Sequence, residues 1–379
     1  MTETMRAVAV VPGRREVTLA QFPTPLIEGP GQALLRMLEV GVCGTDKEIC
    51  AFDYGTPPPG SDRLVIGHES LAEVVETGPE VSGVRAGDLV VTMVRRPCPH
   101  AHCLPCRGGQ PAFCSTGDFR ERGIKEAHGF MTEFVVDEAR YMVPVPATLR
   151  DVAVLIEPLT IAEKALIQLW RIQERLPWQC PHAAEEGRGH CHKALVLGAG
   201  PVGLLGALAL AAAGFETFVY SREPEDGPKA SLVHSFGGRY ISAATDPPAS
   251  LCEKVGGIDL VYEAVGLPGI AFEVMGRLAP NGVFLFTGVP PIKGPTSIDA
   301  DRLMRRMVLN NQIVLGTVNA GRDAFEAAIR DLGVFEARWP QAIRGVITGR
   351  YPLEAYRDLL LGSVRGIKNV LMLQPEGRA

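Results

Sequence analysis

The sequence lacks features that mark several classes of protein. Basic residues are not in excess, because 38 Lys and Arg stand against 43 Asp and Glu, so the basic footprint of a nucleic-acid-binding protein is missing. The residues that follow Met1 contain no apolar signal region, and secretion is not indicated. We therefore expect a mildly acidic, cytoplasmic, enzyme-like protein that has no nucleic-acid partner.

The sequence also lacks an uninterrupted apolar membrane span. Residues 194–215 carry no charge over a length that could cross a bilayer. However, Gly198-Ala199-Gly200-Pro201 interrupts this stretch, and such punctuation is typical of a strand, a tight turn and a buried helix. We expect no membrane partner.

Cysteine is scarce, with nine residues in 379, but four of them fall within seventeen positions. The four are spaced Cys98-x4-Cys103-x2-Cys106-x7-Cys114. Thiolates at such short separations can surround one divalent ion and leave no open coordination position, which predicts a structural zinc site. A disulfide is the alternative, but the odd total favours reduced thiols and metal binding. His100 and His102 lie in the first gap and could replace one thiolate.

A chain of this length is too long for one compact core and predicts two domains. Short β-like runs separated by Gly and Pro predict an irregular β domain over residues 1–160. Strands that alternate with helices predict a parallel, doubly wound α/β sheet over 161–318, and 319–379 is expected to return to the first domain. The expected strands are 32–40, 69–77, 88–94, 131–136, 194–197, 216–220, 259–264, 283–287, 313–317 and 368–373.

The helices are expected to begin at about residue 151. Helical spacing predicts one helix over 151–159 and a second over 160–176, with Pro158 separating them. Two further helices are expected at 325–332 and 353–361.

A glycine-rich turn indicates a dinucleotide cofactor. Gly198 allows the tight exit from the strand, Gly200 lets the backbone approach a pyrophosphate, and Gly203 lets the helix pack against the sheet. Pro201 and Val202 complete the turn, where the helix N-terminus offers free amides to the phosphates. The motif alone is weak, but here it follows an apolar strand and opens a helix.

A second constellation indicates a catalytic metal. Catalytic zinc needs mixed ligands and one exchangeable position, which Cys43, His68 and a carboxylate could provide. Glu157 is the best third ligand. Each residue alone is more often structural, but their joint presence beside a nucleotide motif favours a catalytic zinc site.

Together these motifs resemble the zinc-containing medium-chain dehydrogenases over nearly the whole chain. The matching segments are 41–46, 67–69, 87–90, the four-cysteine segment, 157–159 and 198–203. Within that family the sequence is most similar to archaeal-type glucose 1-dehydrogenases, through residues 95–98, 117–123, 128–131 and 316–319. The four-residue gap after Cys98 departs from the two-residue gap of the alcohol dehydrogenases.

The resemblance implies a GroES-like catalytic domain, a Rossmann domain, and assembly as a homodimer or homotetramer. It also implies that Glu69 is a transient zinc ligand and that Thr45 receives the substrate proton. Glu121 and Asn319 match positions that contact the sugar, and Asn319 is expected near the cofactor as well. Zinc would lower the pKa of the anomeric hydroxyl of an aldose, and hydride transfer to the nicotinamide would give the lactone.

The end of the second strand of the nucleotide domain predicts the choice of cofactor. NAD-specific folds carry Asp or Glu there, whereas this chain has Ser221 and then Arg222, which can donate to a phosphate and pair with it. We therefore expect NADP to be preferred and NAD to be tolerated. In the alternative, Arg222 is a solvated charge and Glu223 binds the ribose.

Other readings stay open. A polyol or secondary-alcohol dehydrogenase would keep every metal and nucleotide motif, with Glu121 and Asn319 as the discriminating residues. A non-catalytic nucleotide sensor would have no need of the metal ligands. Glucose, galactose and xylose differ by one hydroxyl orientation or one carbon, and the sequence does not rank them. The segment with Cys180, His182, His190, Cys191 and His192 is expected to be a solvated connection, with an extra metal site as the alternative.

Overall fold

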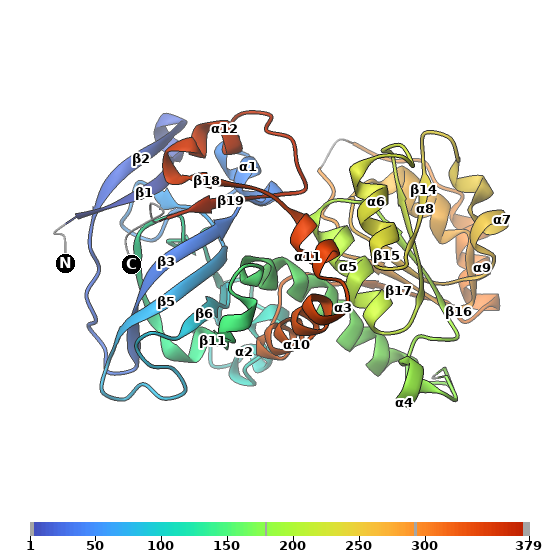
Figure 1. Cartoon of the computed structure of the whole chain (residues 1–379), viewed down its shortest axis with the longest axis horizontal. Helices are drawn as coiled ribbons and strands as arrows, with labels where there is room; N and C mark the ends of the chain where they lie inside the picture. Colours follow the sequence, from blue (N-terminus) through green and yellow to red (C-terminus); the bar gives the residue numbers. More distant parts are fainter. Residues whose placement is uncertain (1–3, 179, 292–293, 374–379) are drawn as a thin grey trace. The chain divides into compact units, whose positions relative to one another are not determined.

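The computed structural model describes residues 4–178, 180–291 and 294–373 (Figure 1). The chain divides into a first unit, Met1–Thr160, Asn319–Leu332 and Ile347–Ala379, and a second unit, Ile161–Val318 and Gly333–Val346. The sequence prediction differs in one place, because it assigns the whole of 319–379 to the first domain. Gly333–Val346 belongs to the second unit, where α11 (Pro340–Val346) packs against α5 (Pro201–Ala212) and α6 (Pro228–Ser235).

A seven-stranded sheet forms the centre of the first unit. Its order is β11-β6-β5-β3-β19-β18, with β10 also pairing with β3. The strand β3 pairs antiparallel with β5 and with β19, so the C-terminal strand lies against a strand from the start of the chain. The strands are β3 (Gln32–Gly41), β5 (Glu69–Thr77), β6 (Leu89–Thr92), β10 (Phe134–Glu138), β11 (Met142–Val145), β18 (Ile347–Pro352) and β19 (Lys368–Met372).

Two three-stranded sheets and short helices complete the first unit. The sheets have the orders β2-β1-β4 and β7-β8-β9. Their strands are β1 (Thr4–Val11), β2 (Glu16–Pro23), β4 (Leu64–Val65), β7 (Arg95–Arg96), β8 (Arg120–Arg122) and β9 (Glu126–Ala127). The helices are α1 (Gly44–Cys50), α2 (Leu104–Arg107) and α12 (Tyr356–Leu360), with 3-10 turns at Pro12–Arg14, Pro111–Phe113, Ala139–Tyr141, Ala147–Leu149, Ala153–Leu155 and Leu353–Ala355.

The core of this unit joins segments that are distant in sequence. Leu35 and Met37 of β3 pack with Val74 of β5, Leu371 of β19 and Leu359 of α12. Central strands bury side chains on both faces and favour β-branched and large apolar residues. The residues that close the core therefore come from both ends of the chain.

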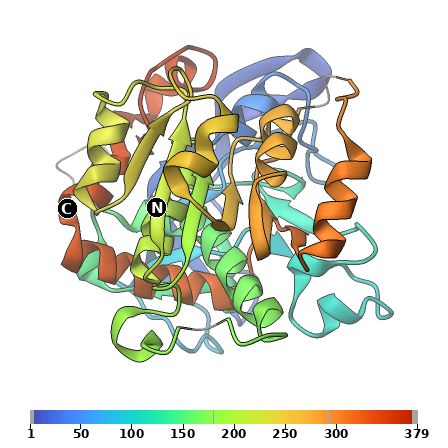
Figure 2. The same ribbon diagram turned by 90° about the vertical axis from the view of Figure 1, so that its right-hand side faces the viewer.

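The second unit is built on a six-stranded parallel sheet, which confirms the predicted doubly wound α/β domain. Its order is β14-β13-β12-β15-β16-β17, with the order reversing on either side of β12. Figure 2 looks onto this unit, coloured green to orange, with helices in front of the strands. The strands are β12 (Lys193–Leu197), β13 (Glu216–Ser221), β14 (Arg239–Ser242), β15 (Ile258–Glu263), β16 (Leu278–Phe286) and β17 (Ile313–Gly316).

Helices follow most of these strands. They are α4 (Ala183–Glu186), α5 (Pro201–Ala212), α6 (Pro228–Ser235), α7 (Leu251–Val255), α8 (Pro268–Met275), α9 (Ala300–Leu309) and α11 (Pro340–Val346), with a 3-10 turn at Pro248–Ser250. Residues 194–215 form most of β12, the tight turn and α5, as predicted. Within the described residues, no helix combines the length and the apolar character needed to cross a membrane.

Two helices run from one unit into the other along the chain, α3 (Ile156–Gln173) and α10 (Arg322–Arg338). The prediction of two helices separated by Pro158 is wrong, because α3 is continuous through it. Pro158 is the third residue of α3, and backbone N–H groups in the first turn have no partner within the helix, so proline is tolerated there. Glu157 consequently lies in the first turn of a long helix.

Candidate functional site

The candidate metal site begins at the N-terminus of α1. Cys43 is the residue before the helix, and its backbone N–H donates to Asp46 Oδ2 at 2.8 Å. Asp46 is completely buried. An acidic side chain three residues into a helix that reaches back to the cap fixes the first turn, and here it fixes the backbone that carries the Cys43 thiol.

Ligand atoms of Cys43, His68 and Glu69 lie within 4.8 Å of one another. A thiol, an imidazole and a carboxylate form the mixed donor set of a catalytic zinc site, so these residues fit the ion that the sequence predicts. Glu69 is the first residue of β5 and His68 directly precedes it, while Cys43 follows the end of β3, the strand beside β5. Their roles as ligands stay predictions.

Asp46 also orients His68. Its Oδ1 lies 3.4 Å from His68 Nδ1, which leaves Nε2 as the nitrogen free for a metal. Burial alone lowers the pKa of His68, but the charge of Asp46 and the neighbouring Cys43 outweigh it, so the pKa is raised well above its usual value. A metal at this site must displace a firmly held proton, and its affinity falls with falling pH.

Glu157 belongs to the same neighbourhood, although its carboxylate is not among the three that converge most closely. Burial raises its pKa to about 7, and the charges of His68, Glu69 and Lys368 also act on it. A carboxyl that titrates near neutrality can both bind a cation and move a proton. Its predicted role as third ligand remains a prediction.

Glu69 is held by a lysine that the sequence did not suggest. Lys368 Nζ donates to both carboxylate oxygens, at 2.7 and 2.6 Å, and both side chains are 2% exposed. The site leaves no room for a side chain at Gly41, because a Cβ there would lie 2.0 Å from Glu69 Oε2. Glu69 is therefore an ion-paired carboxylate in this structure, and Lys368 competes with any metal for it.

The four predicted thiols converge as well. Ligand atoms of Cys98, Cys103, Cys106 and Cys114 lie within 4.8 Å of one another, and neither His100 nor His102 belongs to this group. Instead, His100 Nε2 pairs with Asp118 Oδ2 at 2.5 Å. The four-residue gap after Cys98 is thus compatible with an all-cysteine cluster.

The thiols of this cluster differ in acidity. The interaction with Ser115 lowers the pKa of the Cys103 thiol to about 5, whereas burial raises the pKa of the Cys106 thiol to about 12. Because the thiolate is the form that binds metal, Cys103 is the thiol best prepared to act as a ligand near neutral pH. The all-sulfur donor set fits a closed structural zinc site, which stays a prediction.

The connection before β12 corrects one expectation. Cys180 and Cys191 form a disulfide, with Cα atoms 5.7 Å apart, so these two thiols are neither reduced nor metal ligands. Much of the segment is solvated, as predicted, because His182, His190 and Cys191 are exposed. Its ends pack together: His192 stacks on Trp178 at 4.0 Å, and its Nε2 contacts Trp178 O at 2.6 Å.

The predicted sugar contacts are placed as follows. Glu121 is 3% exposed, and its Oε1 accepts from Arg95 Nε at 3.1 Å and Nη2 at 3.0 Å. Arg95 stacks over Phe119, with 3.6 Å from Cζ to the ring centroid. Burial raises the pKa of Tyr54, and the charges of Glu121 and His68 also act on it.

Thr45 and Asn319 are the remaining predicted contacts with substrate and cofactor. Thr45 is partly buried in the first turn of α1, two residues after Cys43. Asn319 has a φ of 57°, the left-handed conformation that Asn tolerates better than most residues. Their predicted contacts with substrate and cofactor stay predictions.

The nucleotide turn has the backbone that its glycines require. Gly198 has a φ of 101°, and a Cβ at Gly203 would lie 2.1 Å from Gly198 O. Helix α5 begins at Pro201, directly after Gly200, and Val202 is its second residue. The strand, turn and helix therefore adopt the geometry predicted for a pyrophosphate site, and no side chain other than hydrogen fits at Gly203 without movement.

Beyond the turn, β13 ends at Ser221, and Arg222 is exposed. Ser221 Oγ donates to Glu223 Oε2 at 2.5 Å, and Lys229 Nζ donates to Glu223 Oε1. Sequence reasoning placed Ser221 and Arg222 at the cofactor but did not single out Lys229.

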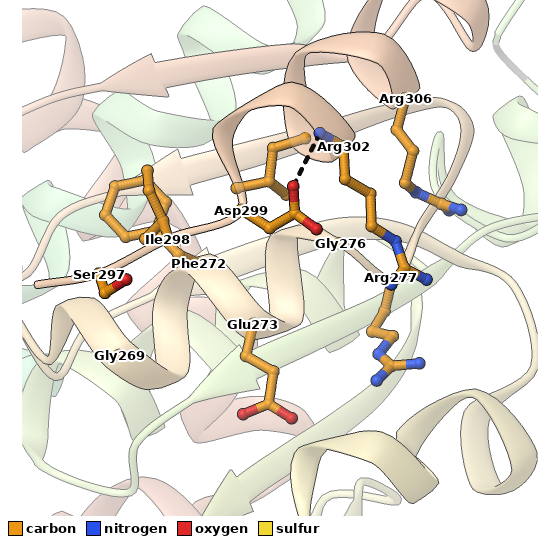
Figure 3. A pocket seen from close by; sticks show the side chains of 11 residues that line it. Gly269, Phe272, Glu273, Gly276, Arg277, Ser297, Ile298, Asp299, Arg302 and Arg306 are labelled. Carbon is orange, nitrogen blue, oxygen red and sulfur yellow. Dashed lines mark hydrogen bonds between the residues drawn. The ribbon is translucent and has the colours of Figure 1, made fainter.

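A separate pocket of about 340 Å³ lies in the second unit, between α8 and the segment that leads into α9 (Figure 3). Arg277, Arg302 and Arg306 gather on one side of it, and Phe272 and Ile298 on the other. The residues predicted for the zinc and nucleotide sites do not line this pocket.

Sequence reasoning thus missed three residues that support the predicted metal and sugar contacts. Asp46 had a signal, because an acid three residues after a helix cap is a capping pattern. Arg95 stands in a segment that carries the resemblance but gave no sign of its pairing with Glu121. Lys368, 299 positions from Glu69, gave none.

Comparisons with known proteins identify the family. Residues 29–147 match the alcohol dehydrogenase GroES-like domain, and residues 150–373 match the glucose dehydrogenase C-terminus. A glucose 1-dehydrogenase of Methanocella arvoryzae is 39% identical over 367 residues, covering 96% of this chain and 98% of that one. A glucose 1-dehydrogenase of Thermoproteus tenax is 41% identical over 375 residues, covering 98% and 100%.

The fold is equally similar to a solved structure. Haloferax mediterranei glucose dehydrogenase in complex with NADP, Zn and gluconolactone superposes with a TM-score of 0.86 at 32% identity, covering 98% of this chain and 100% of that one. The predicted GroES-like domain and parallel nucleotide-binding sheet are confirmed by these matches. The chain belongs to the zinc-containing medium-chain dehydrogenase family, in its glucose dehydrogenase branch.

Proposed function

We propose that this protein oxidises an aldose, most simply D-glucose, at the anomeric carbon to the aldonolactone, with zinc and NADP. The observation that carries the proposal is the convergence of Cys43, His68 and Glu69 in a chain 32% identical, over nearly its whole length, to a dehydrogenase captured with NADP, Zn and gluconolactone. A mixed donor set of this kind belongs to reaction chemistry, because it leaves a coordination position for substrate.

Residues of the first unit bind the metal ion and orient its ligands. Cys43, His68 and Glu157 would hold the ion, with Glu69 as a transient ligand, and Asp46 orients the imidazole. Bound zinc supplies a Lewis acid for the sugar hydroxyl, and bound NADP supplies the hydride acceptor.

Other side chains handle the substrate itself. Thr45 receives the hydroxyl proton and passes it on. Glu121 and Asn319 hold hydroxyls of the sugar ring. Because Arg95 binds one carboxylate oxygen of Glu121 through two N–H groups, the other oxygen is oriented toward a fixed direction, as selection of a hydroxyl requires.

The cofactor binds the second unit through Gly198, Gly200, Pro201, Val202 and Gly203 at its pyrophosphate. Ser221 and Arg222 contact the adenine ribose, with NADP preferred over NAD. Asn319 is a further cofactor contact. The exposed guanidinium at the end of β13 supports this preference, because it can pair with a 2′-phosphate.

A substrate screen tests the proposal. Glucose, galactose, xylose, a polyol such as sorbitol and a simple secondary alcohol are assayed with each nicotinamide cofactor, and the lactone is trapped with hydroxylamine. We expect turnover of aldoses with lactone formation. Turnover of the polyol alone would make the protein a polyol dehydrogenase, and a metal-loaded protein that binds NADP but turns over none of them would be a sensor.

The cofactor preference has its own test. Arg222→Ala should lower the ratio of kcat/KM with NADP to kcat/KM with NAD by about tenfold, because it removes a charge-assisted contact to the phosphate. Arg365→Ala, which removes an exposed arginine of the first unit, is the matched control and should leave the ratio unchanged. A ratio unaffected by Arg222→Ala would remove that residue from the phosphate site.

We also propose that the protein assembles as a homodimer or homotetramer. Helix α9 exposes Met304, Val308 and Leu309, and large exposed apolar side chains grouped on one element mark association surfaces. Val308→Asp should lower the molecular mass measured by light scattering, whereas an unchanged mass would place the interface elsewhere.

The cytoplasm is the proposed location, because the four clustered thiols must stay reduced to hold a metal. Seven of the nine cysteines are unpaired, and the Cys180–Cys191 disulfide is the exception. Localisation of the tagged protein in its own cells, by fractionation, tests this.

A further inference from the structure

The carboxylate of Glu223 occupies a small site built for an anion. Ser221 Oγ donates to one carboxylate oxygen at 2.5 Å, and Lys229 Nζ donates to the other. Ser221 ends β13 and Lys229 is the second residue of α6, so the two donors come from different elements and converge on one carboxylate. The side chains of Glu223 and Lys229 are 31% and 21% exposed, which leaves the cluster open to a ligand.

The backbone holds Glu223 in this position. Its carbonyl oxygen accepts from Ser242 Oγ at 2.8 Å and from Tyr240 OH at 3.2 Å. Both donors belong to β14, the strand that pairs in parallel with β13. The carboxylate is held by the side chains of Ser221 and Lys229 and by the backbone N–H of Glu223 itself. The two side-chain donors can therefore exchange this carboxylate for another anion while the backbone stays.

The charge state of Glu223 is that of an anion bound by Ser221 and Lys229. Burial raises the pKa of its carboxyl, but the hydrogen bonds from Lys229 and Ser221 outweigh burial and lower it. Glu223 is therefore ionised at neutral pH, as an internal anion should be.

The same donors suit a phosphate better than a carboxylate. A 2′-phosphate carries close to two negative charges and three acceptor oxygens, and the hydroxyl of Ser221, the ammonium of Lys229 and the neighbouring guanidinium of Arg222 can all donate to it. A ribose 2′-hydroxyl, in contrast, can donate to the carboxylate itself. The end of β13 thus offers an acceptor to the 2′-hydroxyl of NAD and donors to the 2′-phosphate of NADP.

We infer that Glu223 is an internal competitor for the 2′-phosphate subsite: it pairs with Lys229 and Ser221 when the subsite is empty or holds NAD, and NADP displaces it and takes Lys229 as a phosphate ligand. This inference rests on the proposed use of NADP. It assigns a phosphate contact to Lys229 and explains how one site accepts both cofactors, since Glu223 serves the hydroxyl and Lys229 serves the phosphate.

Binding of two cofactor fragments to the full-length protein isolates this subsite. Adenosine 2′,5′-bisphosphate and 5′-AMP differ only in the 2′-phosphate, and calorimetric titration gives the ratio of their dissociation constants without any turnover. Glu223→Gln should raise the preference for the bisphosphate about tenfold, because the competing charge is gone while its shape is kept. Lys229→Met should lower the preference by a similar factor and leave 5′-AMP binding within about twofold.

Matched variants separate this effect from net charge and from folding. Glu225→Gln removes an exposed carboxylate two residues away and should leave the preference unchanged. Because Glu223 competes through Lys229, the gain from Glu223→Gln should shrink in the Lys229→Met background, as coupled residues are non-additive. Thermal melts within a few degrees of the wild type show that each variant is folded.

Two results would overturn the inference. Equal preference in the wild type and in Glu223→Gln would show that the carboxylate does not compete, and an equal loss of both fragments in Lys229→Met would show that the lysine is structural. Glucose turnover with NADP is measured in parallel. A wild type that turns over glucose but fails these tests loses only this inference, whereas a wild type that binds neither fragment loses the proposed cofactor site as well.

Discussion

The four-cysteine cluster and the Cys43 cluster both lie in the first unit, yet they are built in opposite ways. The four thiols come from one segment of seventeen residues, and their neighbours are small hydroxyl side chains such as Ser115. The second cluster joins the residue before α1 to the start of β5, with Glu157 of α3 near enough to feel its charges. Asp46 and Lys368 are its charged supports. A closed shell holds a metal for structure, whereas a mixed shell with tuned carboxylates leaves room for chemistry.

Replacing a ligand of the Cys43 cluster, the mixed cluster, should distinguish the two clusters most clearly. Cys43→Ala and His68→Ala should lower kcat by about a thousandfold or more, because they remove the Lewis acid, while the unfolding midpoint stays within about 3 °C. Steady-state kinetics, metal analysis and thermal melts are the measurements. Cys252→Ser, which alters an exposed thiol, is the control. Loss of the fold in both variants would contradict a catalytic role.

The buried ion pair beside the mixed cluster should matter for stability. Lys368→Met leaves Glu69 buried without its partner and should cost about 3–5 kcal/mol in the free energy of unfolding, measured with urea. Adding Glu69→Gln should recover part of this cost, since the unpaired charge disappears. Lys47→Met removes an exposed lysine of α1 and should change little. Equal instability of the single and double variants would show that packing, rather than charge, is what Lys368 contributes.

The four-cysteine cluster should affect stability and leave chemistry alone. Cys103→Ser or Cys106→Ser should release one metal equivalent and lower the unfolding midpoint by about 5 °C, while kcat at room temperature stays near the wild-type value. Unchanged zinc content in these variants would refute the structural site.

A chelator compares the two clusters in one unaltered protein. A mixed site with an exchangeable position should lose its metal before a closed four-thiolate site does. Activity should therefore fall first, and the melting temperature later, during incubation with 1,10-phenanthroline. Simultaneous loss of both would mean that the clusters do not differ in accessibility.

Local patterns predicted the second unit best. Five of its six strands and the glycine turn follow from apolar runs and punctuation, and the parallel sheet confirms them, whereas β14 was not predicted. Pro158 misled the helix prediction, because proline breaks a helix in its interior and is accepted in its first turn. Cys180 and Cys191 misled the redox expectation, because neither the polar sequence around them nor the odd cysteine count reveals that the fold brings their Cα atoms within 5.7 Å.

The candidate site was predictable where its residues share a motif and unpredictable where they meet through the fold. Cys43 and Asp46 stand in one capping pattern, so both were within reach of the sequence. Glu69 on β5 and Lys368 on β19 meet because both strands pair with β3, and no local sequence pattern encodes this arrangement. The pairing of Glu223 with Lys229 depends in the same way on the fold, because Lys229 belongs to α6 and Glu223 follows β13.

The pairing of Glu69 with Lys368 also delays completion of the first unit during synthesis. The two residues are 299 positions apart, so a ribosome that adds about 5–20 residues per second needs roughly 15–60 s to deliver the lysine after the glutamate. During that interval β3 lacks the neighbour that β19 later provides, and the Glu69 carboxylate must remain hydrated. The first unit of the nascent chain is therefore expected to stay open, and vulnerable to proteases, until β19 emerges and docks.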